Sequence, residues 1–377
     1  MPVRTRTVTE LMTTAGHEQV VFVADRDVGL RAVIAIHSTA LGPSLGGIRF
    51  WRYEHERDAL VDGLALSQAM TRKASIAGLH QGGGKAVVLW DDPERPHTPE
   101  LLHALGRAID DLGGRYLAAE DVGATTGDMD TIAEVTPWVT GVDVARGGSG
   151  DPSQVTAVGV LHSMRAVREH LDGTPQLAGL RVVVQGSGHV GSHVARLLVA
   201  EGAEVLVSDL LPGRAEELAA EVGATVVGHE TALATPCDVV SPSALGGVLD
   251  AAAIAALQCR AIVGAANNQL GAVDADRAIA ARGVLFAPDF VVSGGGIINL
   301  AQEFTGYDRE RALERAAGIG PTLARVLAVA AERGVTPHRA AEDLADERVR
   351  TEGGNRRWRP GDPAAWTNGA PLTRLRP

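Results

Sequence analysis

The chain has 377 residues, of which 45% are hydrophobic and 21% charged, and its formal net charge is −11. This length allows two domains that each bury a core, and the negative charge argues against nucleic acid as the main partner. The two cysteines exclude a disulfide framework, and no stretch approaches the ~18 apolar residues of a membrane span. We therefore expect a cytoplasmic protein with no nucleic-acid and no membrane partner.

The first part of the chain mixes strands and helices. Alternating and β-branched residues predict strands over residues 20–24 and 30–36. The spacing of Leu and Ala predicts a helix over residues 56–70. A further helix is predicted to begin at Thr98-Pro99, because proline is well tolerated at the first helical position, and to end at Gly113-Gly114.

Between these two helices lie two lysines twelve positions apart, Lys73 and Lys85, and three glycines at 82–84 precede the second. We expect the glycines to leave room for a ligand and Lys85 to project into that room. A second ammonium nearby would attract a carboxylate and lower the pKa of one lysine, which makes that lysine a usable acid or base. The alternative is a glycine turn before a strand over residues 86–90, with two solvated lysines.

A glycine-rich polar stretch over residues 145–152 predicts a hinge or domain boundary. After it, a helix from about Val155 opens a regular strand–helix alternation, which is typical of a parallel sheet wrapped by helices. A long alanine-rich helix is predicted over about 309–334, and an irregular tail over residues 353–362. The strands of the alternating series are predicted at residues 180–185, 204–208, 237–240, 260–263 and 284–286.

A glycine fingerprint follows the first strand of this series. Gly186, Gly188 and Gly191 form a Gly-x-Gly-x-x-Gly sequence at the head of a helix, with His189 and Val190 inside it. In this context the glycines allow a tight turn, a close approach to a pyrophosphate and close packing of helix on strand. Because a helix N-terminus also favours phosphate, the segment predicts a dinucleotide site.

The dinucleotide is predicted to be NAD. Asp209 ends the next strand, 18 residues past Gly191, where an acidic side chain accepts hydrogen bonds from the ribose hydroxyls and repels the 2′-phosphate of NADP. Arg214 lies close enough in sequence to keep NADP open. No metal is predicted, because the histidine pair His189 and His193 lacks the Glu of a His-Glu-x-x-His motif.

Together these segments resemble the leucine/valine/phenylalanine dehydrogenase family over nearly the whole chain. The resemblance implies an α/β fold of two domains, a mixed α/β substrate domain over residues 1–147, completed by 336–377, and a Rossmann domain over 148–335. It also implies a homo-oligomer, either a dimer or an octamer. The segments that carry the resemblance are residues 42–49, 70–85, 119–123 with 128–130, 148–153, 186–191, 264–269, and 287–290 with 294–296.

The resemblance implies reversible oxidative deamination of an L-amino acid by NAD, which gives a 2-oxo acid and ammonia. Lys73 would bind the substrate carboxylate, helped by the backbone of Gly46 and Gly47. Lys85 would be the general base that activates water, and Asp121 would take protons from the substrate amine. Without the family context, Asp121 would be interpreted as a turn carboxylate.

The substrate is expected to be an aliphatic branched-chain amino acid, because the apolar Leu45 and Ala119 match pocket-wall positions of the family. The alternatives are an unusual or aromatic amino acid, or a catalytically retired protein that binds NAD or an amino acid. Ser293 stands where the family usually has a substrate-binding Asn, and a hydroxyl offers one donor where the amide has two.

Four more residues match cofactor-contacting positions of the family. Ala265, Ala266 and Asn267 match the stretch along the nicotinamide ribose. Thr156 matches a position near the nicotinamide carboxamide. The alternatives are ordinary turn residues around Asn267 and a helix cap at Thr156.

Overall fold

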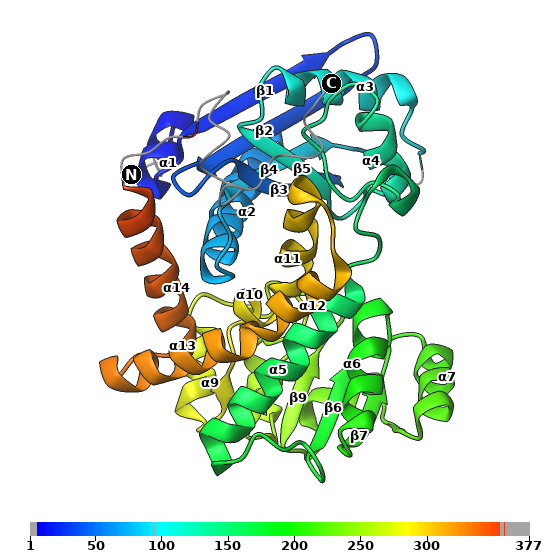
Figure 1. Cartoon of the computed structure of the whole chain (residues 1–377), viewed down its shortest axis with the longest axis vertical. Helices are drawn as coiled ribbons and strands as arrows, with labels where there is room; N and C mark the ends of the chain where they lie inside the picture. The colour runs from blue at the N-terminus through cyan, green and yellow to red at the C-terminus, as the bar shows by residue number, and fades with distance from the viewer. Residues whose placement is uncertain (1–5, 94, 355–357, 359–377) are drawn as a thin grey trace. The chain divides into compact units, whose positions relative to one another are not determined.

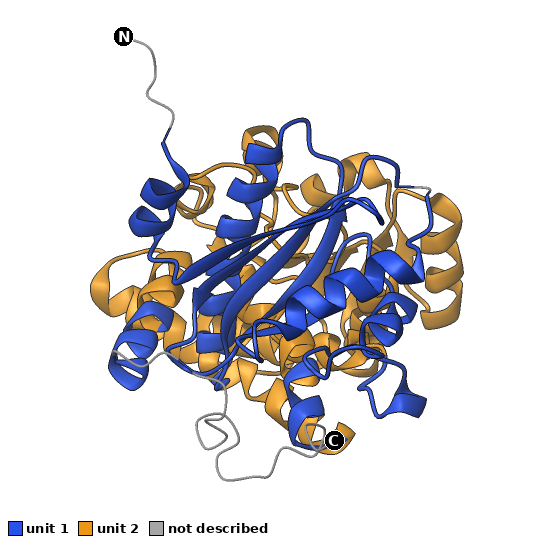
Figure 2. Cartoon of the chain, turned by 90° about the horizontal axis from the view of Figure 1, so that it is seen from above, with its two compact units in different colours: residues 1–150, 300–308, 345–377 blue, residues 151–299, 309–344 orange. Residues whose placement is uncertain are grey.

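The computed structural model describes residues 6–93, 95–354 and 358, and it divides the chain into two compact units (Figures 1 and 2). Unit 1 comprises residues 1–150, 300–308 and 345–377, and unit 2 comprises residues 151–299 and 309–344. Unit 1 is therefore built from three separate stretches of chain. The division of functions between residues 1–147 with 336–377 and residues 148–335 stays a prediction.

Unit 1 contains a five-stranded mixed sheet with the order β1-β2-β4-β3-β5. The pairs β1/β2 and β2/β4 are antiparallel, whereas β3 runs parallel to both β4 and β5. The strands predicted over residues 20–24 and 30–36 are confirmed as β1 and β2, but β3 and β5 were not predicted. The five strands are β1 (Gln19–Asp25), β2 (Leu30–Ser38), β3 (Ser44–Trp51), β4 (Gly82–Leu89) and β5 (Tyr116–Glu120).

Helices cover both faces of this sheet. One face packs on α2 (Glu56–Ile76), where Leu60 and Leu64 meet Val33 and Ala35 of β2. The opposite face forms the larger core, with α3 (Pro99–Asp110) and α4 (Thr126–Ile132). The helix predicted to start at Thr98-Pro99 is confirmed, and the Thr98 side chain accepts a hydrogen bond from the Leu101 N–H as its cap. A short helix, α1 (Val8–Ala15), precedes β1.

Unit 2 contains a six-stranded sheet with the order β11-β10-β9-β6-β7-β8, and every pair in it is parallel. This strand order is that of the dinucleotide-binding Rossmann fold, whose order reverses between β6 and β9. The predicted parallel sheet is therefore confirmed. Its strands are β6 (Arg181–Gln185), β7 (Glu204–Ser208), β8 (Thr225–Val226), β9 (Val239–Pro242), β10 (Ala261–Ile262) and β11 (Leu285–Phe286).

The helices of this part follow the strands along the chain and are labelled in Figure 1 where there is room. Within unit 2 lie α5 (Ser153–Asp172), α6 (His189–Ala200), α7 (Pro212–Val222), α8 (Ala251–Ala256), α9 (Ala275–Ala281) and α10 (Asp289–Val292). After them come α11 (Gly295–Ala301), α12 (Arg309–Ala317), α13 (Ile319–Arg333) and α14 (Pro337–Arg348).

The single helix predicted over residues 309–334 is wrong, because α12 and α13 are separate helices that meet at Gly318. Pro321 has no N–H to donate to the carbonyl four residues back, and its ring would clash with that carbonyl in a continuous helix. The irregular tail predicted over residues 353–362 lies outside the described residues, apart from Gly353, Gly354 and Trp358.

A buried carboxylate fixes the path of the chain where it leaves unit 1 for the first time. Glu303, in the 3₁₀ turn Gln302–Thr305, is 1% exposed. It accepts hydrogen bonds from the Gly141 N–H at 3.2 Å, the Ser149 N–H at 2.9 Å and the Ser149 hydroxyl at 2.6 Å. The returning segment of chain therefore closes the loop that ends at residue 150.

Candidate active site

The pleat of the unit 1 sheet places the predicted catalytic residues on one face. Side chains alternate between the two faces along a strand, and the register aligns Gly47 of β3 with Ala119 of β5 and Lys85 of β4 with Ala35 of β2. Ala35 packs on α2, so the face concerned is the one that α2 covers. The site residues on this face, or directly after it, are Leu45, Gly47, Arg49, Lys85, Ala119 and Asp121.

Lys85 and Asp121 form a buried ion pair. The Lys85 side chain is 5% exposed, and its Nζ lies 2.6 Å from Oδ2 of Asp121. Burial lowers the pKa of Lys85, the Asp121 carboxylate opposes this effect, and the Arg49 guanidinium adds to it. Burial by itself would raise the pKa of Asp121, but the positive charges of Lys85 and Arg49 together lower it. The pair thus joins an ionised carboxylate to an amine that loses its proton more readily than an exposed lysine.

The glycines before Lys85 have a different role from the one we expected. Residues 82–84 lie within β4 and are buried, so neither an open space nor a turn forms there. A Cβ on Gly83 would collide with the backbone of Thr71 and Ser67 in α2, and a Cβ on Gly84 would lie 2.6 Å from the Tyr116 ring. The glycines therefore allow a helix and an aromatic ring to pack directly against the strand that carries Lys85.

Tyr116 fills a gap between two strands beside Lys85. The pairing of β3 with β4 is interrupted at Gly46 and Gly47. The buried Tyr116 hydroxyl occupies the interruption: it donates to the carbonyl oxygens of Gly46 at 2.8 Å and Gly47 at 3.2 Å, and it accepts from the Ala86 N–H at 3.1 Å. Tyr116 was not among the predicted site residues, although it fixes the backbone of both predicted glycines.

Lys73 lies in the last turn of α2, on the helix that packs on this face. Thr71 of the same helix packs against Gly83 of β4. Thr71 stands two residues before Lys73, and Gly83 stands two residues before Lys85. The predicted pocket-wall residues Leu45 and Ala119 are both buried, at 1% and 3% exposure. The predicted residues of unit 1 thus lie on α2, on the adjoining strands β3, β4 and β5, and directly after β5.

Arg49 belongs to this group, and sequence reasoning missed it. Its Nε donates to Asp121 Oδ2 at 2.8 Å and its Nη1 to Asp62 Oδ2 at 3.0 Å. Tyr53 also donates its hydroxyl to Asp62. Arg49 stands two residues after Gly47, so strand alternation would have placed it on the catalytic face if β3 had been predicted.

The glycine fingerprint of unit 2 has the geometry of a dinucleotide turn. Gly186 directly follows β6 with a φ of +103°, which favours glycine. A Cβ on Gly191 would overlap the Gly186 carbonyl, so this residue brings α6 close to the strand. Gly188 caps α6, and no atom lies within 4 Å of the place its Cβ would take. The head of this twelve-residue helix therefore has the open backbone that a pyrophosphate requires, and the residues present fit NAD.

Three further predicted cofactor residues, Asp209, His189 and Val190, lie within or near the fingerprint. Asp209 follows β7, where its Oδ2 accepts the Ser187 N–H at 2.7 Å and its Oδ1 accepts the Leu211 N–H at 2.9 Å. A carboxylate has further lone pairs, so the ribose hydroxyls can still bind. The His189 side chain is 87% exposed with Asp151 3.7 Å away, and Val190 is half-buried.

A second segment of unit 2 brings together other predicted cofactor and substrate residues. Ala265 and Ala266 are buried, and the Ser293 hydroxyl donates to Asn267 Oδ1 at 3.2 Å. Behind them the Gln269 amide donates to the Gly264 and Ala266 carbonyls at 3.0 and 2.9 Å. Asp289 accepts the Gln269 N–H at 2.8 Å. Sequence reasoning singled out neither Gln269 nor Asp289, which hold this loop in place. The structure places Ser293 and Asn267 in unit 2 and the lysines in unit 1.

Thr156 does not cap its helix. It stands in the first turn of α5, whose N-cap is Pro152, and its hydroxyl donates to the Pro152 carbonyl at 3.0 Å. A Cβ on Gly295 would lie 2.5 Å from the Thr156 Cα, so Thr156 packs directly against the glycines that follow Ser293.

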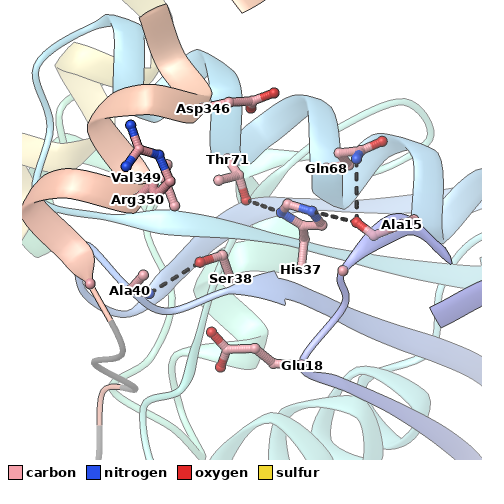
Figure 3. Close-up of a pocket in the computed structure, with 12 residues that line it drawn as sticks. Ala15, Glu18, His37, Ser38, Ala40, Gln68, Thr71, Asp346, Val349 and Arg350 are labelled. Atoms are coloured by element: carbon pink, nitrogen blue, oxygen red, sulfur yellow. Dashed lines mark hydrogen bonds between the residues drawn. The ribbon is translucent and has the colours of Figure 1, made fainter. Parts of the chain in front are cut away.

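A pocket of about 620 Å³ opens elsewhere in unit 1 (Figure 3). His37 lines this pocket and forms hydrogen bonds with the Thr71 hydroxyl at 2.8 Å and the Ala15 carbonyl at 3.1 Å. Burial lowers the pKa of His37 to about 4, so the ring is neutral at neutral pH. None of the predicted site residues lines this pocket, and it is therefore not the candidate active site.

Over residues 6–93, 95–354 and 358, no three His, Cys, Asp or Glu side chains are grouped so that they could hold a metal ion. Over the same residues, no helix has the length and hydrophobicity that crossing a membrane requires.

Two family models together match most of the chain. The model for the dimerisation domain of Glu/Leu/Phe/Val dehydrogenases matches residues 17–138, and that for Glutamate/Leucine/Phenylalanine/Valine dehydrogenase matches residues 147–210 and 213–352. A Rossmann unit and a buried lysine–carboxylate pair are what an amino-acid dehydrogenase needs. The chain belongs to the Glu/Leu/Phe/Val dehydrogenase family. The family, the fold class and the enzyme class predicted from the sequence are therefore confirmed.

Individual relatives agree with this membership. Leucine dehydrogenase of Bacillus cereus is 43% identical over 333 residues, which cover 88% of this chain and 91% of that protein. Valine dehydrogenase of Streptomyces virginiae is 44% identical over 340 residues, covering 89% and 94%. Among solved structures, L-tryptophan dehydrogenase from Nostoc punctiforme has a TM-score of 0.82 at 38% identity, covering 91% of this chain and 99% of that one.

Proposed function

We propose that this protein catalyses the reversible, NAD-dependent oxidative deamination of an aliphatic branched-chain L-amino acid to the 2-oxo acid and ammonia. The observation that supports it most is the buried Lys85–Asp121 pair, with Nζ and Oδ2 2.6 Å apart. The similarity to leucine and valine dehydrogenases at 43% and 44% identity supports the substrate class.

The predicted catalytic and carboxylate-binding residues of unit 1 have separate roles in this proposal. Lys73 binds the substrate carboxylate as a point charge, next to the backbone of Gly46 and Gly47. Asp121 accepts a proton from the substrate ammonium, because only the neutral amine can release a hydride from its Cα. NAD, held by the residues of unit 2, would supply the acceptor for that hydride, and loss of the hydride converts the substrate into an imine. Lys85 then takes a proton from the water that attacks the imine, and ammonia leaves.

The residues of unit 2 hold NAD in this proposal. Gly186, Gly188 and Gly191, with His189 and Val190, surround the pyrophosphate, and Asp209 binds the adenosine ribose. Around the nicotinamide ribose and carboxamide we place Ala265, Ala266, Asn267 and Thr156, with Ser293 on the substrate. The substrate and NAD-binding domains correspond in this proposal to residues 1–147 with 336–377 and to residues 148–335.

The test is a ranking of substrates. Valine, leucine and isoleucine should give the highest kcat/KM, with graded differences, since one methylene in an apolar pocket changes binding by only ~1–3 kcal/mol. Glutamate should fail, because its second carboxylate would be buried unpaired near Leu45 and Ala119. The measurement is NADH production over the twenty protein amino acids and a set of non-protein ones.

The Ser293→Asn variant is the matched control in this ranking. If the wild type is inactive and the variant active, the protein is a retired binding protein rather than an enzyme. If aromatic or acidic substrates rank first, the argument from Leu45 and Ala119 is wrong. The aromatic outcome is the second candidate function, because the chain is similar in structure to an L-tryptophan dehydrogenase with a TM-score of 0.82.

Asp209 is expected to set the preference for NAD. Asp209→Ser removes the charge that repels a 2′-phosphate, so kcat/KM with NADP should rise relative to NAD by about tenfold or more. Asp209→Asn is the control for the local structure. It also removes the charge, but its amide oxygen can still accept the hydrogen bond that the Leu211 N–H donates to Asp209 at 2.9 Å. Initial rates with both cofactors measure the effect. A wild type that already uses both equally would contradict this role, and Arg214 would then be examined.

We further propose a homo-oligomer, a dimer or an octamer, in the cytoplasm. The dimerisation-domain model that matches residues 17–138 supports self-association. The two free thiols, Cys237 and Cys259, are compatible with a reducing compartment.

A further inference from the structure

Arg49 joins three elements of unit 1 at the candidate site. It stands on β3, and its guanidinium donates to Asp121, directly after β5, and to Asp62, on α2. The two N···O distances are 2.8 and 3.0 Å, and the Arg49 side chain is 20% exposed. A planar guanidinium bound at two nitrogens has one orientation, so it fixes both carboxylates relative to β3.

This arrangement divides the two oxygens of Asp121 between different tasks. Lys85 Nζ and Arg49 Nε both bind Oδ2, at 2.6 and 2.8 Å. Oδ1 receives no hydrogen bond from any described residue, and the Asp121 side chain is 23% exposed. Because Oδ2 is held from two sides, the carboxylate cannot rotate without losing two charge-assisted hydrogen bonds. Oδ1 is therefore the oxygen that faces outward.

Arg49 also sets the charge balance around Lys85. The charged and titratable groups that act on this amine are Asp121, Arg49 and Asp62. Tyr53 binds Asp62, and Tyr116 lies beside the neighbouring Ala86. A guanidinium stays charged at every working pH, so it permanently offsets part of the Asp121 charge. Without Arg49, the negative charges of Asp121 and Asp62 would favour the protonated form of Lys85 more strongly.

We propose that Arg49 is a positioning residue for deamination: it fixes Asp121 so that Oδ2 serves Lys85 and Oδ1 receives the proton of the substrate amine. This inference rests on the proposed function, in which Lys85 and Asp121 carry the proton transfers. In this inference Arg49 acts on the reaction through its contacts to Asp121 and Asp62.

The first test compares Arg49→Gln and Arg49→Lys with Arg31→Gln. Arg31 stands on β2 of the same sheet, and its replacement removes an exposed ion pair with Asp91. Arg49→Gln should lower kcat about 100-fold, since a small displacement of a catalytic group has effects of this size, with the affinity for NAD unchanged. Arg49→Lys should recover part of this loss, because the positive charge returns without the planar, two-point hydrogen bonding of the guanidinium. Arg31→Gln should behave as the wild type.

The second test measures the ionisation of Lys85 without any turnover. Lys73 and Lys85 are the only lysines in the chain, so trace acetylation followed by mass spectrometry reports on two side chains and the N-terminus. Arg49→Gln should move the pH midpoint of Lys85 acetylation upward, because a positive charge is lost. Asp62→Asn should move it downward, because a negative charge is lost. A purely structural role for Arg49 predicts no such opposite pair of shifts.

The outcomes separate this inference from the proposed function. A wild type that deaminates no amino acid overturns the proposed function, and the acetylation midpoints still decide the role of Arg49. Wild-type kcat in Arg49→Gln, or an unchanged Lys85 midpoint in a variant that melts like the wild type, would overturn the positioning role.

Discussion

Replacing Lys85 with alanine is expected to lower kcat by about 10³- to 10⁴-fold, the upper range for loss of an acid–base group. The variant should fold, because Asp121 keeps its hydrogen bond from Arg49 at 2.8 Å and no buried carboxylate is left unpaired. NAD should bind as in the wild type, since the glycine fingerprint belongs to unit 2 and Lys85 to unit 1. Fluorescence titration with NAD and a deamination assay on one preparation test both statements.

Lys85→Arg is the matched control for this variant. It keeps a positive charge beside Asp121, but a guanidinium does not lose its proton in a protein. If Lys85 is the base, Lys85→Arg should be nearly as inactive as Lys85→Ala. An active Lys85→Arg would mean that Lys85 contributes only its charge, and substantial activity in Lys85→Ala would remove it from the base role.

The pH dependence has a definite sign. A general base works only when deprotonated, so kcat/KM should rise with pH through the pKa of Lys85. Burial lowers this pKa, and the Asp121 charge opposes the effect. The rise should therefore fall below the range in which an exposed lysine titrates.

Gly83→Ala is expected to destabilise the fold by about 3 kcal/mol, as overpacking of a close contact does. The new Cβ would collide with the backbone of Thr71 and Ser67, so α2 must move away from β4. Because Lys73 lies in the last turn of α2, substrate affinity should fall together with stability. Chemical denaturation and the KM for the amino acid measure the two effects.

Gly127→Ala is the control for this substitution. Gly127 lies in α4 of the same unit, and its Cβ would meet only the Thr125 hydroxyl, at 3.7 Å. Alanine in that helix should be neutral or stabilise by up to about 1 kcal/mol. Equal stabilities for the two variants would show that the approach of α2 to Gly83 is less close than described.

The parts of the fold that follow a regular period were predictable from the sequence. In unit 2 each apolar strand is followed by a helix, and β7 begins and ends at the predicted residues, Glu204 and Ser208. In unit 1, β3 was missed, because Gly46 and Gly47 are residues that depress strand propensity. They occur in this strand for a tertiary reason, the entry of the Tyr116 hydroxyl between β3 and β4, which no local pattern contains.

The candidate site shows the same division. The chemistry of Lys85 was predicted from its residue type and its neighbours in sequence, and the direction of its lowered pKa agrees. The reason differs, because burial is the largest cause of the lowered pKa of Lys85. The cation that adds to this effect is Arg49 rather than the expected Lys73. Arg49 was missed because its partners, Asp62 and Asp121, lie 13 and 72 residues away in the sequence. Whether residues so far apart meet in space is decided by the order of the strands.

The buried Glu303 limits where this chain can be divided into fragments. A fragment that ends at residue 150 would lack the acceptor for the Gly141 N–H and for both donors of Ser149. The two Ser149 donors are buried, and each would lose its partner at a cost of about 1–3 kcal/mol. A chimera that exchanges unit 2 between members of the family therefore has to keep residues 300–308 together with residues 1–150. The module to be exchanged is a set of discontinuous segments rather than one continuous half of the sequence.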